Sequence, residues 1–183
     1  MAEHMVSEHH PITLVLGGAR SGKSRHAQSL AESGWQQPVF LASAEALDDE
    51  MQRRIALHRE GRGPRWKTIE EPLEVARIFR APSVDGDVLL WDCATLWLSN
   101  VLLKEGEEAL PKRQEEAIEA LRHAARDVIV VSNEVGLGLV PPYPLGRAFR
   151  DAAGRFNQDL AALADHVVLL VAGLPLVLKG EEK

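Results

Sequence analysis

The stretch from Gly17 to Ser24 reads Gly-Gly-Ala-Arg-Ser-Gly-Lys-Ser and matches the pattern G-x-x-x-x-G-K-[ST]. The apolar, β-branched run 12–16 precedes it and predicts a buried strand, and alanine and leucine at helical spacing over 25–33 predict a helix after it. A strand, a glycine-rich loop and a helix aim backbone N–H groups and a positive helix end at a phosphate chain. A chance glycine-rich turn would not have both flanks. We therefore predict a site for a nucleoside triphosphate.

Each kind of residue in this loop has its own expected role in nucleotide binding. Glycines let the backbone close around the anion, the Lys23 ammonium is expected to reach the β- and γ-phosphates, and the Ser24 hydroxyl is placed to hold Mg²⁺. Lys23 would also neutralise departing phosphate groups and is therefore a predicted catalytic residue. The predicted nucleotide-binding residues of the loop are Gly17, Gly18, Ala19, Arg20, Ser21, Gly22, Lys23 and Ser24.

The composition is that of an ordinary soluble globular protein. The 183 residues are 45% hydrophobic and 26% charged, which suits one domain with a large core. The net charge of −6 and the pI near 5.7 disfavour a nucleic-acid-binding surface, which is normally basic. Cys93 is the only cysteine, so an intramolecular disulfide and a cysteine metal cage are excluded, and a reducing cytoplasm fits.

The patterns near the two ends of the sequence predict neither a targeting segment nor a membrane span. Residues 1–10 are polar and lack the apolar core of a signal peptide, so we expect a disordered leader there and a single nucleotide-binding domain over 11–183. The longest apolar run, 167–178, is interrupted by Gly173 and Pro175 and is too short to span a bilayer. We expect no membrane span.

Strand and helix patterns alternate along the rest of the chain. Further apolar runs predict strands over 38–42, 87–92, 128–131 and 167–171, with a short edge strand at 176–178. Helical spacing predicts helices over 48–59, 72–80, 95–103 and 112–126, and a long one from Leu145 with an apolar stripe. The 95–103 helix is apolar nearly all round, as in a core or a subunit contact. This alternation predicts an α/β fold whose mostly parallel sheet has helices on both faces.

Ligands of such sheets bind outside the carboxyl ends of the strands. This rule predicts one crevice lined by the glycine-rich loop, Ala42, Ser43, Asp92 and the residues 133–134. Asp92 ends an apolar strand, as does the second acidic motif of P-loop proteins, where a carboxylate holds Mg²⁺. A turn residue or a helix cap is the alternative interpretation of Asp92.

His58 can be interpreted in two ways. By periodicity it is the last residue of an apolar helical stripe, which is typical of a partly buried histidine. However, Arg59, Arg62 and Arg65 surround it, and guanidinium groups match the oxygens of a polyphosphate. A neutral imidazole in such a place can attack an α-phosphorus and carry the nucleotidyl group covalently.

Six further segments accompany the glycine-rich loop: 47–51, 58–62, 66–70, 92–100, 133–140 and 147–157. Together they resemble the bifunctional adenosylcobinamide kinase / adenosylcobinamide-phosphate guanylyltransferase family of cobalamin biosynthesis. The resemblance covers nearly everything from Ile12 to Lys179. The loop alone is shared by many families, whereas the His58 and Asn133 segments are far more specific.

The resemblance implies two reactions on a corrinoid substrate. Such an enzyme phosphorylates the aminopropanol hydroxyl of adenosylcobinamide with ATP or GTP, and then transfers GMP from GTP to the new phosphate through a guanylylated histidine. His58 matches that histidine, and Gly17 to Ser24 match the phosphate loop. Further matches to nucleotide-binding positions are Ala42, Ser43, Ala44, Arg59, Glu60, Gly61, Arg62, Glu70 and Asp92. The resemblance also implies a RecA-like sheet, Mg²⁺ and a homo-oligomer, namely a trimer to which the 95–103 helix could contribute.

This sequence departs from some family members at two positions. Leu57 precedes His58 where some members have a second histidine, which leaves one candidate nucleophile, and Asp92 replaces a glutamate. The general base of the kinase step stays open between Asp48, Asp49, Glu50 and Glu134.

Three other functions are compatible with the loop. A kinase of another small alcohol would share it without using His58. A RecA-like motor or switch acting on DNA is disfavoured by the acidic pI and by the absence of a basic surface with interleaved aromatic residues. A nucleotide-gated scaffold would leave the histidine among arginines without a purpose.

Overall fold

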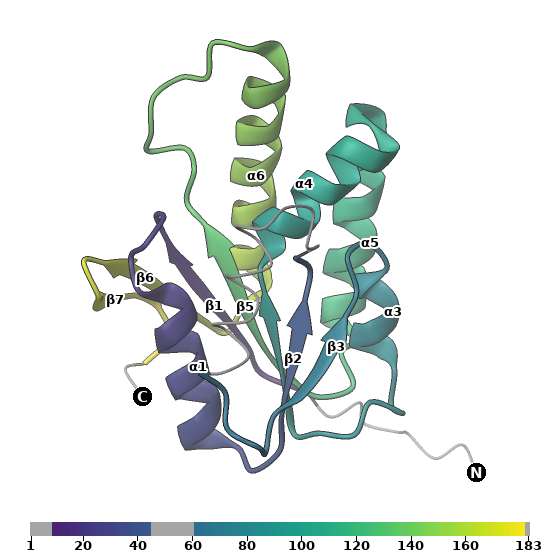
Figure 1. The fold of residues 1–183 in the computed structure, drawn as a ribbon, viewed down its shortest axis with the longest axis vertical. Coiled ribbons are helices and arrows are strands. Elements are labelled where there is room, and N and C mark those ends of the chain that lie inside the picture. Colours follow the sequence, from purple (N-terminus) through teal and green to yellow (C-terminus); the bar gives the residue numbers. More distant parts are fainter. Residues whose placement is uncertain (1–8, 45–60, 182–183) are drawn as a thin grey trace.

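The computed structural model describes residues 9–44 and 61–181, which form a seven-stranded sheet with helices on both faces (Figure 1). The strands are β1 (Ile12–Gly17), β2 (Pro38–Ala42), β3 (Lys67–Glu70), β4 (Val88–Asp92), β5 (Asp127–Asn133), β6 (His166–Val171) and β7 (Leu174–Lys179). The described helices are α1 (Lys23–Gly34), α3 (Val75–Arg80), α4 (Ala94–Glu105), α5 (Leu110–Arg122) and α6 (Pro144–Leu163), with a 3₁₀ turn at Glu107–Ala109.

The strand order is β3-β2-β4-β5-β1-β6-β7, and only the β6–β7 pair is antiparallel. The predicted mostly parallel α/β sheet is therefore confirmed. Strand β5 lies between β1 and β4. In the parallel β1–β5 pair, Gly17, the last residue of β1, pairs with Asn133, the last residue of β5. The carboxyl ends of the parallel strands thus meet at one edge of the sheet.

Alternation along each strand divides the core between the two faces of the sheet. Leu14 and Leu16 of β1 belong to the larger cluster, which packs under α3 to α6, whereas Val15 belongs to a smaller cluster under α1. Trp91 of β4 is fully buried in the larger cluster. Residues buried on both sides of the sheet explain why the strands read as continuous apolar runs.

Helices α4 and α6 carry the face opposite α1. Trp97, Leu98 and Val101 of α4 are buried, so the apolar helix predicted over 95–103 lies in the core of this chain. Along the predicted stripe of α6, Ala152, Phe156 and Leu160 are buried, and Phe149 and Leu163 pack partly against the core. Leu145 at its start is exposed, because α6 extends beyond the sheet there (Figure 1).

Several predicted boundaries were wrong, and one strand was missed. The helix predicted over 72–80 begins only at Val75, and the helix predicted over 112–126 ends at Arg122. Residues 67–70 form β3, an edge strand with mostly exposed side chains and hence no apolar alternation. The helix predicted over 48–59 lies outside the described residues. No helix in the ranges 9–44 and 61–181 combines the length and apolar character of a membrane-crossing segment.

Candidate functional site

The glycine-rich loop connects β1 directly to α1. Gly22 has φ of +95°, a backbone conformation that favours glycine, and α1 begins at the next residue, Lys23. A Cβ atom on Gly17 would lie 2.4 Å from the Ser21 Oγ and 2.9 Å from the Leu170 carbonyl oxygen. The two glycines therefore allow a tight turn that a side chain at either position would strain.

Neighbouring segments hold this loop at both ends. The Glu134 backbone N–H donates to the Gly17 carbonyl at 3.1 Å, and the Gly173 N–H, from the β6–β7 turn, donates to the Ser21 carbonyl at 2.9 Å. The β6–β7 hairpin lies beside the loop in Figure 1. The loop conformation is thus supported by the segments that follow β5 and β6, the two strands that pair with β1.

A hollow of about 670 Å³ opens at the N-terminus of α1 and is lined by Ala19, Arg20, Gly22, Lys23, Ser24, Arg25 and Asn133. Its size is that of small-ligand sites in general. The Lys23 side chain is almost fully buried, and its Nζ donates to the Gly18 carbonyl at 3.1 Å. A buried ammonium and the positive end of α1 thus face the same space, which favours an anion.

Two buried polar atoms beside this hollow have no hydrogen-bond partner among the described residues. They are the Ser21 Oγ, in the loop, and the Asn133 Oδ1, at the end of β5. Buried polar groups in native proteins nearly always have a partner, which can be a bound ligand or water.

Asp92 ends β4 at the same edge of the sheet, half-buried and paired with Ala42 of β2 and Val131 of β5. The charges of Asp92 and Lys23 both influence the pKa of the next residue, Cys93. The pKa of the Cys93 thiol is raised to about 11, mainly by burial and also by the Asp92 carboxylate, while the Lys23 ammonium acts to lower it. Asp92 and Lys23 therefore act on the same buried group from a strand end and from the loop.

Ser43 follows β2 but points into the protein. Its side chain is fully buried, and its Oγ accepts a hydrogen bond from the Trp91 Nε1 at 2.7 Å. The Ser43 carbonyl accepts from the Asn100 Nδ2 at 2.8 Å, and the same Nδ2 lies 3.1 Å from the Pro72 carbonyl. Ser43 is thus held at the strand edge by the core rather than lining the hollow. Ala42 and Ala44 beside it are half-buried, and Glu70, at the end of β3, is exposed.

Residues 61–66 lie against α1. The Gly61 carbonyl accepts from the Gln28 Nε2 at 2.9 Å, and the Arg65 guanidinium donates to the Glu32 carbonyl at 2.6 Å. The Arg62 guanidinium lies 3.7 Å from the centroid of the Phe40 ring. Two of the arginines predicted to surround a polyphosphate thus contact residues of this chain. The predicted site residues His58, Arg59 and Glu60 and the candidate bases Asp48, Asp49 and Glu50 lie outside the described residues.

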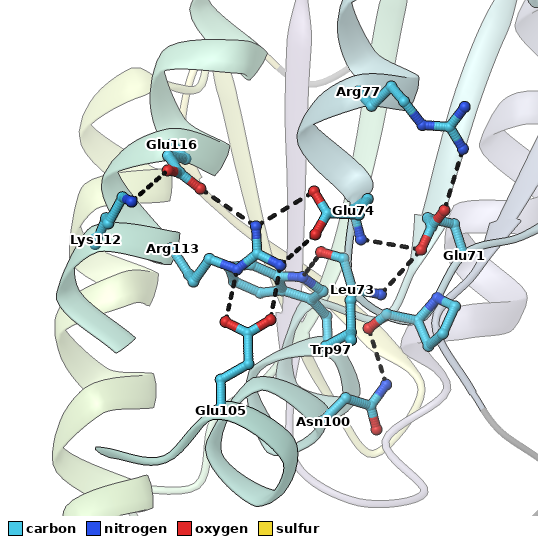
Figure 2. A network of polar contacts seen from close by, with 11 residues as sticks. Glu71, Leu73, Glu74, Arg77, Trp97, Asn100, Glu105, Lys112, Arg113 and Glu116 are labelled. Atoms are coloured by element: carbon cyan, nitrogen blue, oxygen red, sulfur yellow. Dashed lines mark hydrogen bonds and ion pairs between the residues drawn. The ribbon is translucent and has the colours of Figure 1, made fainter. Parts of the chain in front are cut away.

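A polar network holds the connection between β3 and α3 against α4 and α5 (Figure 2). The Arg113 guanidinium of α5 donates to Glu74 at 2.5 Å, to Glu105 at 2.8 Å and to Glu116 at 3.3 Å. Glu71 accepts from the backbone N–H groups of Leu73 and Glu74, which delays the start of α3. The network fixes the segment that follows Glu70, so it supports the sheet edge where the candidate site lies.

We expect Arg113→Met to lower the free energy of unfolding by about 1–2 kcal/mol at pH 7, because three partly exposed carboxylates lose their shared partner. The hydrogen bond from the Arg113 guanidinium holds the pKa of the Glu74 carboxyl below its ordinary value of 4.5. A carboxyl whose pKa is lower in the folded state than in the unfolded state stabilises the protein at pH values above the unfolded-state pKa. This stabilisation is lost as the pH falls through the folded-state pKa. Urea unfolding should therefore show a difference that shrinks below about pH 4.5.

Lys112→Met is the matched control, because Lys112 is an exposed neighbour that pairs with Glu116 only at 3.8 Å. Its expected effect is less than about 0.5 kcal/mol. An Arg113→Met effect no larger than that of this control would show that the network adds little to stability.

The fold and the loop together define a P-loop nucleotide-binding protein of the α/β class. Residues 13–178 match the family model described as cobinamide kinase / cobinamide phosphate guanyltransferase. The chain belongs to this family and is therefore an enzyme that uses nucleoside triphosphates. The resemblance found in its sequence motifs is thus confirmed.

Curated relatives support the same family. The bifunctional adenosylcobalamin biosynthesis protein CobP of Pseudomonas aeruginosa is 46% identical over 168 residues, which cover 92% of this chain and 97% of that protein. The bifunctional adenosylcobalamin biosynthesis proteins CobU of Escherichia coli and Salmonella typhimurium are 39% and 40% identical over 181 residues, covering 92% of this chain and 99% of each relative. The similarity thus extends over nearly the whole of each protein.

Proposed function

We propose that this enzyme phosphorylates the aminopropanol hydroxyl of adenosylcobinamide with ATP or GTP and then transfers GMP from GTP to the new phosphate. The products of the second reaction are adenosylcobinamide-GDP and pyrophosphate, in cobalamin biosynthesis. Membership of the cobinamide kinase / cobinamide phosphate guanyltransferase family supports both reactions, and the names of the relatives support adenosylcobalamin biosynthesis. The structural observation that carries the proposal is the hollow at the N-terminus of α1, which the buried Lys23 faces.

The kinase reaction depends mainly on positioning and on charge. The loop N–H groups and Lys23 would hold the triphosphate and stabilise the charge on the transferred γ-phosphoryl group. Glu134 is the one described candidate for the general base, and its Oε1 accepts from the Gly136 N–H at 2.8 Å. The attacking hydroxyl would lose its proton to such a base while its oxygen forms the new bond to phosphorus.

The guanylyl transfer is proposed to pass through His58. A nitrogen of its imidazole would form a bond to the α-phosphorus of GTP while the bond from that phosphorus to the departing pyrophosphate oxygen breaks. An oxygen of the corrinoid phosphate would then attack the same phosphorus and break the P–N bond, which frees the imidazole. A neutral nucleophile avoids bringing the corrinoid phosphate directly against the triphosphate, since both are anions.

Ser24 and Asp92 are the residues proposed to hold Mg²⁺. Their oxygen donors suit this ion, which binds through one or two protein oxygens together with substrate phosphates. Within the ranges 9–44 and 61–181, no three His, Cys, Asp or Glu side chains cluster as a metal cage. When bound, Mg²⁺ would neutralise charge on the phosphate oxygens. The trimer and the cytoplasmic location stay predictions from the sequence.

Incubation with α-³²P-GTP and Mg²⁺ tests the covalent step. The folded chain should retain an acid-labile, base-stable label, and His58→Ala should retain none, because the P–N bond cannot form without the imidazole. Adding adenosylcobinamide phosphate should release the label as the guanylylated product. His123→Ala is the matched control, because His123 is an exposed histidine of the segment after α5 that pairs with Glu119, and this variant should be labelled like the unaltered chain.

Label on neither chain, together with measurable GTP binding, would favour a P-loop kinase of another small alcohol. Equal label on the chain and on His58→Ala would place the nucleophile elsewhere. Either result would overturn the role of His58 while leaving the nucleotide site intact.

A further inference from the structure

The connection between β5 and α6, residues 134–143, carries four large apolar side chains that are exposed. Leu137, Leu139, Val140 and Tyr143 are 85%, 96%, 67% and 74% exposed, and we call these four residues the apolar loop. Large apolar side chains that gather on a protein surface typically mark a binding site. None of the roles proposed above uses them.

The connection that carries the apolar loop begins at the hollow beside the glycine-rich loop. Asn133, which lines that hollow, is the last residue of β5. The backbone N–H of the next residue, Glu134, donates to the Gly17 carbonyl at 3.1 Å. From there the connection projects beyond the carboxyl ends of the strands before it reaches α6 (Figure 1). The apolar loop is thus continuous with the candidate nucleotide site.

Polar contacts and prolines restrict the backbone of this connection. The Gly136 N–H donates to the Glu134 Oε1 at 2.8 Å. The Arg147 guanidinium of α6 donates to the Pro141 and Pro142 carbonyls at 3.1 and 2.8 Å, and each proline ring fixes its own φ angle. A surface that is held in this way loses little conformational entropy when a ligand covers it, which favours binding.

The side chains of the connection favour a neutral ligand. No residue between Glu134 and Arg147 carries a charged side chain. A charged ligand covering this surface would lose its hydration without gaining an ion pair, whereas an apolar ligand would not bear that cost. A corrin macrocycle has apolar ring faces, methyl groups along its rim and neutral amide side chains. Its surface therefore matches that of the apolar loop.

We propose that the apolar loop binds the corrin ring of the substrate while the aminopropanol arm of the same molecule reaches into the hollow. The hydroxyl group of this arm must approach the γ-phosphate, so the ring has to rest on a surface next to the hollow. Glu134, the described candidate for the general base, stands in the chain between Asn133 and the apolar loop. This inference rests on the proposed function, and it adds to it the surface that selects a corrinoid.

Calorimetry with adenosylcobinamide alone and with α,β-methylene GTP alone tests the inference without any turnover. A leucine that moves from water into an apolar contact contributes enough free energy for about a tenfold change in affinity. Leu139→Ser should therefore weaken adenosylcobinamide binding about tenfold and leave α,β-methylene GTP binding within about twofold. Leu139→Met keeps an apolar side chain of similar volume, so its adenosylcobinamide affinity should stay within about threefold of that of the unaltered chain.

Leu178→Ser is the matched control, because Leu178 is also exposed and lies beside the start of β6, at the edge of the sheet opposite the hollow. It should bind both ligands like the unaltered chain. Unchanged adenosylcobinamide affinity in Leu139→Ser would overturn the inference. Equal losses of affinity for the two ligands would also overturn it, because they would assign the apolar loop a structural role.

Light scattering of the same variants tests whether a second copy of this chain covers the surface instead. A lower molar mass for Leu139→Ser, with adenosylcobinamide affinity retained, would show such a contact between copies and overturn the inference. Failure of the unaltered chain to bind adenosylcobinamide, while it binds α,β-methylene GTP, would overturn the proposed function and leave the nucleotide site intact.

Discussion

Lys23→Met is expected to lower the rates of phosphoryl transfer and of guanylyl transfer by about 10²–10³-fold, the usual cost of removing one electrostatic stabiliser from an active site. Methionine keeps most of the length of the buried side chain but removes the ammonium group at the mouth of the loop. The Lys23 Nζ donates to the loop at the Gly18 carbonyl and is the one buried cation of the described hollow. Its charge acts on whichever phosphate carries the developing negative charge.

The measurement combines initial rates of both half-reactions with thermal unfolding. The unfolding temperature should change by only a few degrees, because the substitution removes a buried charge rather than an apolar contact. Lys112→Met, far from the hollow on α5, should leave both rates unchanged. Rates for Lys23→Met equal to those of the unaltered chain would show that the reacting phosphates do not bind at this loop.

Trp91→Ala is expected to lower the free energy of unfolding by about 3–5 kcal/mol, because it leaves a large cavity in the core. Trp91 is fully buried at the centre of an aromatic cluster, with ring centroids 5.2 Å from Phe79, 5.6 Å from Trp97 and 6.3 Å from Phe156. Its Nε1 is also the hydrogen-bond donor to the buried Ser43 Oγ. The substitution therefore removes packing and leaves a buried hydroxyl without its donor.

Urea unfolding at one protein concentration, compared with Trp91→Phe, separates these two effects. Phenylalanine keeps much of the aromatic packing but cannot donate to Ser43, so a loss of about 1–3 kcal/mol is expected. A loss for Trp91→Ala below about 1.5 kcal/mol would show that the cluster collapses around the missing ring. Equal losses for the two variants would show that the hydrogen bond to Ser43 outweighs the packing.

Local patterns predicted the elements whose residues are buried on both sides. The runs that form β1, β2, β4 and β5 were recognised because a strand inside a covered parallel sheet must be apolar throughout. In contrast, β3 carries mostly exposed side chains, and only its pairing with β2 makes it a strand. The segment before α3 is held by a distant residue as well as by Glu71, since the Asn100 amide donates to the Pro72 carbonyl. No window of sequence contains that contact.

The sequence by itself determined the glycine-rich loop between β1 and α1, because its glycines, its lysine and its flanking strand and helix are contiguous in the chain. It also carried the family, through motifs that the comparisons confirm. Only the tertiary structure decided that β5 lies between β1 and β4 and that Ser43 points into the core. These features depend on strand pairing and on side chains far apart in the chain, whose energies arise only when the sheet is assembled.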